Sequence, residues 1–367
     1  MTLQLPDINT PTIYGSKSKL PQALSPCTLS FCIPTYNRSS TVHILVERIL
    51  QCTAPDIEVV VLDNGSTDDT LKRLNTIDDE RLTIYANGAN MGVIFNVVNV
   101  LTLGRGIYST LLLDKDLINP FSIEKFRDFI VTHRVSCGIS KYNGAPGDLD
   151  EIYFSGLAAI RKIAYTCHHP TGYFFDTQLL KKLKPNHRFI DYDYVGHFPF
   201  EFMLAELALQ GSVAIYKAPL FTPENVHVQN IKKSVGTNAS SEDAFFSPNG
   251  RLKMAINFSH HICSLPLAPE EKKGLILDCL FRGLIAATWG YRMVLRDQDI
   301  CSHYHIGSRR VGYFEMISLA FYFIDKCTKE SSQFKVEERC FSYGALFIGL
   351  FSRILYALGR RLKRAIL

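Results

Sequence analysis

Short apolar runs alternate with polar turns and helical patterns along the first part of this chain. Four runs are predicted to be buried strands because they are short, rich in β-compatible residues and nearly uncharged: 29–33, 57–62, 82–85 and 109–113. Helical patterns follow these runs and end near residues 51, 74, 103 and 132. Strand, loop and helix repeated in this order predict an α/β fold with a mostly parallel sheet flanked by helices.

The pattern changes in the second half of the chain. Further strands are predicted at 136–140 and 212–216, with an apolar helix before the second of them. A long loop rich in Asn, Ser, Gly and Lys is predicted after them, and the remainder is helical over about 252–263, 269–296 and 312–327. We therefore expect four parts: an irregular N-terminal arm (1–27), an α/β domain (28–250), a helical region (251–342) and a terminal helix (343–367).

The terminal segment 343–367 predicts a basic amphipathic helix. Its apolar positions recur at helical spacing: Phe347, Leu350, Phe351, Ile354, Leu355, Leu358 and Leu362. Arg353, Arg360 and Arg364 gather on the opposite side. An apolar face with a basic flank is typical of a helix that lies in a membrane interface, where each basic side chain adds about 1 kcal/mol at an anionic surface. The alternative is a helix that packs on its own domain or on a partner.

Composition narrows the functional classes. The chain has 367 residues, of which 47% are hydrophobic and 20% charged, as expected for a globular protein. The formal net charge of +5 is modest, so no nucleic-acid partner is expected. The ten cysteines include no C-x-x-C pair, which favours reduced thiols in the cytoplasm. We find no signal peptide and no apolar stretch of membrane-spanning length.

The polar clusters of the α/β domain fall at the ends of its predicted strands, at 35–38, 63–68, 90–92 and 114–116. In parallel α/β sheets, ligands bind at the carboxyl ends of the strands. Four separate loops are therefore expected to meet in one crevice.

Two carboxylates, Asp114 and Asp116, alternate where the strand at 109–113 should leave the core. An unpaired buried carboxylate is costly, and a hard divalent cation such as Mg²⁺ or Mn²⁺ is one suitable partner. The alternative is a surface turn, since Asp is a common turn residue and Asn119-Pro120 follows at once.

Four segments together resemble the nucleotide-sugar-binding half of family-2 glycosyltransferases: P-T-Y-N-R at 34–38, V-V-V-L-D-N-G-S-T-D at 59–68, N-M-G at 90–92 and L-L-L-D-K-D at 111–116. They occur in the order and spacing of that family, and the resemblance covers roughly residues 28–225. The N-M-G segment with Asn96, and P-T-G-Y-F at 170–174, are most similar to the branch that includes abequosyltransferases of bacterial envelope polysaccharides.

The resemblance implies a GT-A fold and inverting transfer of a sugar from a nucleotide-diphospho-sugar. It implies that Asp63 holds the nucleotide base, that the loop 34–38 wraps it, and that Asp114 and Asp116 hold Mn²⁺ or Mg²⁺ at the diphosphate. Asp116 is expected nearest the exposed strand end. Turn roles are the alternatives for Asp63 and Asn90. The residues predicted to bind the nucleotide-sugar are Pro34, Thr35, Tyr36, Asn37, Arg38, Asp63, Asn64, Asn90, Gly92, Asn96, Asp114 and Lys115.

The catalytic base is expected near the apolar helix that ends by residue 209, where the family usually carries an acid. Glu201 is the first choice, Asp193 the second and His197 the third. The match is imperfect, because Glu201 lies about one position from the usual acid. An acid at a helix N-terminus also interacts favourably with the helix dipole, which is the alternative for Glu201. For the pair His168-His169, acceptor binding or a structural role is preferred over metal binding.

These observations predict a metal-dependent inverting glycosyltransferase that acts at the cytoplasmic face of a membrane, as a peripheral protein. Its acceptor would be a glycan or lipid-linked glycan in bacterial surface polysaccharide synthesis. A nucleotidyltransferase is one alternative, although the loop 34–38 lacks the glycines of a phosphate loop. A non-catalytic scaffold that docks partners through its C-terminal helices is the other.

Overall fold

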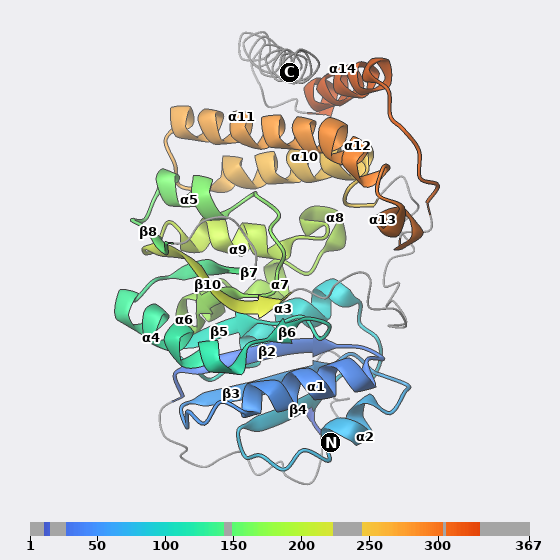
Figure 1. The fold of residues 1–367 in the computed structure, drawn as a ribbon. Helices are drawn as coiled ribbons and strands as arrows, with labels where there is room; N and C mark the ends of the chain where they lie inside the picture. Colours follow the sequence, from blue (N-terminus) through green and yellow to red (C-terminus); the bar gives the residue numbers. More distant parts are fainter. Residues whose placement is uncertain (1–10, 15–26, 143–148, 223–243, 304–305, 331–367) are drawn as a thin grey trace, which may run out of the picture. The chain divides into compact units, whose positions relative to one another are not determined.

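The computed structural model describes residues 11–14, 27–142, 149–222, 244–303 and 306–330. The chain divides into two compact units, unit 1 (1–237) and unit 2 (238–367) (Figure 1). The terminal segment 343–367, for which an interfacial helix was predicted, lies outside the described residues.

Unit 1 is built on one sheet. Among the described residues its ten strands follow the order β1-β4-β3-β2-β5-β9-β7-β10-β6, and β8 pairs with β10. The strands are β1 (Thr12–Ile13), β2 (Leu29–Thr35), β3 (Ile57–Asp63), β4 (Leu82–Ala86), β5 (Tyr108–Leu111), β6 (Leu117–Ile118), β7 (Cys137–Tyr142), β8 (Glu151–Tyr153), β9 (Tyr173–Asp176) and β10 (Val213–Thr222). The pairs β4-β3, β3-β2, β2-β5 and β7-β10 are parallel, which confirms the predicted mixed, mostly parallel sheet.

Helices flank this sheet. They are α1 (Ser39–Leu50), α2 (Thr70–Leu74), α3 (Val93–Leu103), α4 (Ile123–His133), α5 (Leu157–Ile163), α6 (Thr177–Lys182), α7 (Pro185–Arg188), α8 (Tyr192–Val195) and α9 (Pro199–Leu207), with a short 3₁₀ turn at Pro120–Ser122. Buried residues of α1 and α4 share one hydrophobic core with the sheet. Helix α3 packs on β2, β3 and β5 from the opposite face (Figure 1).

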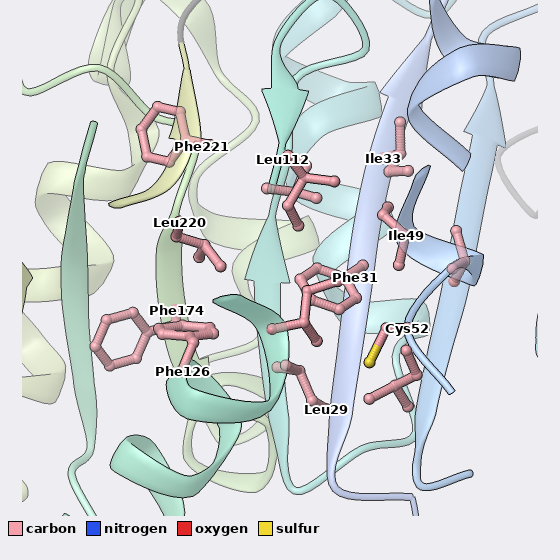
Figure 2. Close-up of a cluster of buried hydrophobic side chains, with 14 of the residues drawn as sticks. Leu29, Phe31, Ile33, Ile49, Cys52, Leu112, Phe126, Phe174, Leu220 and Phe221 are labelled. Carbon is pink, nitrogen blue, oxygen red and sulfur yellow. The ribbon is translucent and has the colours of Figure 1, made fainter. Parts of the chain in front are cut away.

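Side-chain alternation explains why these runs form strands. Successive residues of a strand point to opposite faces, so Leu29, Phe31 and Ile33 of β2 all face the α1 and α4 side (Figure 2). The ring of Phe126 in α4 meets that of Phe174 in β9 edge to face, with centroids 5.3 Å apart. Helices cover both faces, so all seven residues of β2 are buried and the strand is mostly apolar, with Ser30 and Thr35 as its polar residues. Each large apolar side chain contributes about 2 kcal/mol.

Two features near β5 differ from the prediction. The strand ends at Leu111 rather than at residue 113, and Asp114 lies in a turn beyond it. Strand β9 was not predicted, yet it lies antiparallel between β5 and β7. It brings the chain just before it, which includes Thr171, against the carboxyl end of β5.

Unit 2 is helical, as predicted. Its elements are α10 (Pro248–Ser264), α11 (Pro269–Ile285), a π-helical turn (Ala286–Gly290), α12 (Tyr291–Val294), α13 (Gln298–His303) and α14 (Tyr313–Glu330). The Ser247 hydroxyl caps α10 by accepting from the N–H of Gly250 at 2.9 Å. Within the described ranges, no helix combines the length and apolar character that crossing a membrane requires.

Candidate active site

Three neighbouring parallel strands bring the first polar loops together. Thr35 at the end of β2 stands beside Asp63 at the end of β3. The Thr35 hydroxyl donates to Oδ2 of Asp114 at 2.9 Å, and Nε of Arg38 lies 3.7 Å from Oδ1 of the same carboxylate. The predicted convergence of the loops after β2, β3 and β5 is therefore present in the fold.

The environment of Asp114 raises the pKa of its carboxyl group. Its side chain is 13% exposed. Burial raises its pKa to about 6, against the opposing effects of Arg38, Thr35 and Lys115. Lys115 itself is half-buried in the same turn. A carboxyl group with this pKa is mostly ionised at neutral pH and carries negative charge at the sheet edge.

The loops that follow β2 and β3 are joined through Asp63. Its Oδ2 accepts from the N–H of Ser66 at 2.8 Å, and its Oδ1 accepts from the Ser66 hydroxyl. The N–H of Asn37 donates to the same hydroxyl at 2.8 Å, and Asn37 Oδ1 accepts from the N–H of Thr67 at 2.8 Å. Asp63 is fully buried and burial raises its pKa. These contacts match the turn alternative, so base binding by Asp63 stays a prediction.

A network of asparagines holds the N-M-G loop. Asn64 donates to Asn90 Oδ1 at 2.9 Å and accepts from Nδ2 of Asn87 at 3.0 Å. Asn87 also donates to Asn96 Oδ1 at 3.1 Å. Gly92, also predicted to bind, accepts from Asn64 through its carbonyl oxygen at 3.2 Å. The structure thus brings together four of the residues predicted to bind the nucleotide-sugar: Asn64, Asn90, Gly92 and Asn96. It adds Asn87, whose only signal in the sequence was its place as a polar residue after a predicted strand.

Gly65 allows the loop after β3 to approach the backbone at Ala89 and Asn90, which precede Gly92. The φ of +74° at Gly65 lies in the left-handed region, and an added Cβ would lie 2.7 Å from the backbone carbon of Ala89. Only glycine fits both the conformation and the contact.

Asp116 is more buried than Asp114, which is the reverse of the expected order. It is 2% exposed, because the chain turns after β5 and the N–H of Asp116 donates to the Leu113 carbonyl at 3.1 Å. Its Oδ2 lies 2.6 Å from His169 Nε2 and accepts from the hydroxyl of Thr171. The Thr171 hydroxyl in turn accepts from the N–H of Leu113 at 3.0 Å.

The sequence did not assign His169 and Thr171 to this site. The only signal was the His-His-Pro-Thr-Gly stretch at 168–172. Of the two histidines, His169 contacts Asp116, and its ring stacks on Phe221 of β10 with centroids 5.9 Å apart.

The three candidate bases occupy different environments. Glu201, in the first turn of α9, is fully buried and burial raises its pKa to about 7. Its carboxylate accepts from the N–H groups of Thr166 and Cys167 at 2.8 and 2.9 Å. Asp193 is exposed on α8. His197 Nε2 lies 2.7 Å from the hydroxyl of Tyr192.

Comparison with known proteins identifies the region that carries these loops. Residues 30–188 match the family described as Glycosyl transferase family 2. These residues are similar to family 2 glycosyltransferases over less than half of the chain. The matched region contains every predicted nucleotide-sugar-binding residue, and the candidate bases Asp193, His197 and Glu201 lie just beyond it.

Three curated relatives match parts of this chain. An uncharacterized glycosyltransferase of Mycoplasma genitalium, MG060, is 31% identical over 121 residues, which are 31% of this chain and 41% of the relative. Chondroitin synthase of Escherichia coli is 32% identical over 34% of this chain and 18% of its own length. The E. coli glucosyltransferase WfaP is 30% identical over 31% of this chain and 45% of its own length. The chain thus spans less than half the length of these relatives.

Solved structures confirm the GT-A-like fold. S. aureus TarS superposes with a TM-score of 0.51 at 17% identity, over 70% of this chain and 43% of TarS. Residues 1–349 of TarS in complex with UDP-GlcNAc superpose with a TM-score of 0.50 at 14% identity, over 83% of this chain and 92% of that one. At these identities the likeness concerns the fold alone.

Two carboxylates after β5 have the chemistry that suits a hard divalent cation. Asp114 and Asp116 supply carboxylate oxygens in the turn after β5, and Mg²⁺ typically takes one or two carboxylates together with substrate phosphates. Within the described residues, no group of three or more His, Cys, Asp and Glu side chains is arranged around one ion. The oxygens of a diphosphate and of water would complete the coordination of an ion held by these two aspartates.

Proposed function

We propose that this chain is a metal-dependent glycosyltransferase that moves a sugar from a nucleotide-diphospho-sugar to a glycan acceptor with inversion. The observation that supports this most strongly is the junction of Thr35, Arg38 and Asp114 beside Asp63, at the carboxyl edge of three parallel strands. The family 2 match covers all four residues.

The residues of this edge have separate tasks in the proposed reaction. The loops 34–38 and 63–68, joined through Asn37 and Ser66, enclose the nucleotide. Asp114 and Asp116 hold Mn²⁺ or Mg²⁺, which when bound stabilises the negative charge that develops on the leaving diphosphate. The Arg38 guanidinium adds positive charge beside Asp114.

Inverting transfer also needs a group that takes the proton of the acceptor hydroxyl. The three candidates remain Glu201, Asp193 and His197. Glu201 has a pKa of about 7, which suits a base at neutral pH. Asp193 is exposed on α8, which suits contact with an acceptor that arrives from solvent.

The acceptor is proposed from the relatives. The name of WfaP states that it transfers glucose to a GlcNAc-diphosphoundecaprenol, and chondroitin synthase is named for a polysaccharide. We infer a glycan or lipid-linked glycan of bacterial origin as the acceptor here. The predicted amphipathic helix at 343–367 would then hold the enzyme at the inner membrane face, as a peripheral protein.

Calorimetry on the full chain tests the donor site. UDP, GDP and dTDP are titrated with and without Mn²⁺ into the wild type, Asp114→Asn and Asp128→Asn. Asp128 lies on α4 with its side chain 67% exposed, so it provides the matched control. Mn²⁺ should strengthen binding of one nucleotide to the wild type and the control but not to Asp114→Asn.

The proposal fails if none of the three nucleotides binds in Mn²⁺, or if Asp114→Asn keeps the full effect of the metal. A nucleotidyltransferase would instead bind nucleoside triphosphates in preference, and a scaffold would bind neither class. A screen of nucleotide-sugars for slow hydrolysis then identifies the donor.

A further inference from the structure

The carboxylate of Glu201 is held inside unit 1 and has 0% exposure. Its Oε2 accepts from the N–H of Thr166 at 2.8 Å and its Oε1 accepts from the N–H of Cys167 at 2.9 Å. A buried carboxylate persists only where donors or counter-charges compensate it. Two successive backbone N–H groups do so here. Glu201 therefore fixes the backbone at these two residues.

This backbone needs to be fixed. Tyr165 and Cys167 have φ angles of 57° and 53°, in the left-handed region. Non-glycine residues adopt that region at a cost and remain in it only where the surrounding structure determines it. The two hydrogen bonds from Thr166 and Cys167 to Glu201 hold the backbone in this conformation.

A tyrosine connects the same carboxylate to the middle of the segment. The hydroxyl of Tyr173 lies 3.2 Å from Oε1 of Glu201 and 3.0 Å from the carbonyl oxygen of His168. The Tyr173 ring is fully buried in β9, so the hydroxyl has one well-defined position. It links Glu201 to the residue next to His169.

The far end of the segment holds Asp116. His169 Nε2 lies 2.6 Å from Asp116 Oδ2, and the Thr171 hydroxyl donates to that same oxygen. The N–H of Gly172 donates to the Leu111 carbonyl at 2.7 Å, which fixes this end to β5. We name residues 165–171 the bridging segment, because Glu201 holds its start and Asp116 its end.

We propose that Glu201 is a positioning residue for Asp116 and acts through the bridging segment. This inference rests on the proposed function, since it concerns a carboxylate that would hold the metal. Hydrogen-bond partners set the orientation of a ligating carboxylate, and their loss typically costs about 10–100-fold in metal affinity. A base must come within about 3 Å of the proton it takes, whereas Glu201 is enclosed by the segment it fixes.

The variant Glu201→Gln separates positioning from proton transfer. It keeps the side-chain size but turns an NH₂ group towards one of the two backbone N–H groups. In calorimetry on the full chain, Mn²⁺-dependent affinity for UDP should fall about 10–100-fold, and metal-free affinity should stay at the wild-type value. A Glu201 that acts only as the base would leave both affinities unchanged and lower kcat alone.

Glu206→Gln is the matched control. Glu206 lies on the same helix, and its carboxylate binds Arg188 at 2.6 Å rather than the bridging segment. The combination of Glu201→Gln with His169→Ala provides a second criterion. Because both would act on Asp116, their effects on the Mn²⁺-dependent affinity should be clearly less than additive. Additive effects contradict the proposal.

Hydrogen exchange on the ligand-free protein tests the coupling without any metal. Glu201→Gln should speed exchange at Thr166 and Cys167, and also in the peptide that covers 113–117. Faster exchange confined to 165–167 overturns the proposal. If Glu201→Gln does not fold, Tyr173→Phe removes one contact of the carboxylate and should give the same pattern with smaller changes. If the wild type binds no nucleoside diphosphate in Mn²⁺, the proposed function fails, and the exchange pattern still decides whether Glu201 positions Asp116.

Discussion

Because the carboxyl group of Glu201 is buried, we expect the free energy of unfolding to depend on pH, and this can be measured without any substrate. The pKa of this carboxyl group is about 7 in the folded chain, against 4.5 for a solvated glutamate. Between these two values the unfolded chain loses this proton while the folded chain keeps it. Stability must then fall as the pH rises through this window, because the unfolded state binds fewer protons.

The magnitude follows from the two pKa values. Their separation corresponds to about 3 kcal/mol once both states have lost the proton, near pH 8. Glu201→Gln cannot titrate, so the difference in unfolding free energy between the variant and the wild type should rise by about 3 kcal/mol in favour of the variant between pH 4.5 and 8. The variant also loses one backbone hydrogen bond. That cost is independent of pH, so it shifts the whole curve and leaves the slope unchanged.

Urea denaturation at a series of pH values measures this difference. The only tryptophan of the chain, Trp289, lies in unit 2. Its fluorescence reports on unit 2, whereas far-UV circular dichroism reports on both units, so a change in the dichroism that the fluorescence does not show belongs to unit 1. Tyr173→Phe should extend the slope to higher pH, because the Tyr173 hydroxyl lowers the pKa of Glu201. A difference that stays flat from pH 4.5 to 8 would refute this account of the Glu201 environment.

Three further outcomes are expected. Asp116→Ala should lose Mn²⁺-dependent nucleotide binding in calorimetry. The loss should be more complete than for Asp114→Ala, because the Asp116 side chain also holds the end of the bridging segment. Full metal-dependent binding by Asp116→Ala argues against the metal site. Gly65→Ala should destabilise unit 1 by about 2 kcal/mol or more in urea, because of its positive φ and the close backbone contact. Gly88→Ala, whose Cβ would enter open space, is the control and should change stability by less than about 1 kcal/mol. Deletion of 343–367 should abolish flotation with anionic vesicles and leave nucleotide binding intact; no flotation of the wild type ends the membrane prediction.

The parallel part of the sheet could be predicted because its strands are covered on both faces. Residues 57–62 form an apolar run interrupted only by one glutamate, and the structure has β3 at Ile57–Asp63. The loops of the site could be predicted for the same reason, since parallel strands place their carboxyl ends at one edge. The contact between Thr35 and Asp114 confirms this.

The fine structure of the site depends on contacts between distant parts of the chain. Asp116 and His169 are 53 positions apart, and no local pattern pairs them. Strand β9 was missed because its four residues follow a Thr-Gly pair typical of a turn, and only pairing with β5 and β7 makes them a strand. Glu201 was interpreted from its place on a helix, whereas its burial arises from the bridging segment folding over it.

The position of β9 in the sheet affects how unit 1 folds during its synthesis on the ribosome. Strands β5 and β7 are complete by residue 142, but each pairs with β9, which begins at residue 173. At about 5–20 residues per second, this interval of 31 residues lasts roughly 2–6 s. During that time the edges of β5 and β7 that β9 will cover have no partner, and β7 also still lacks β10 on its other side; such edges invite aggregation. Nascent chains released within this interval should be those that chaperones hold most tightly.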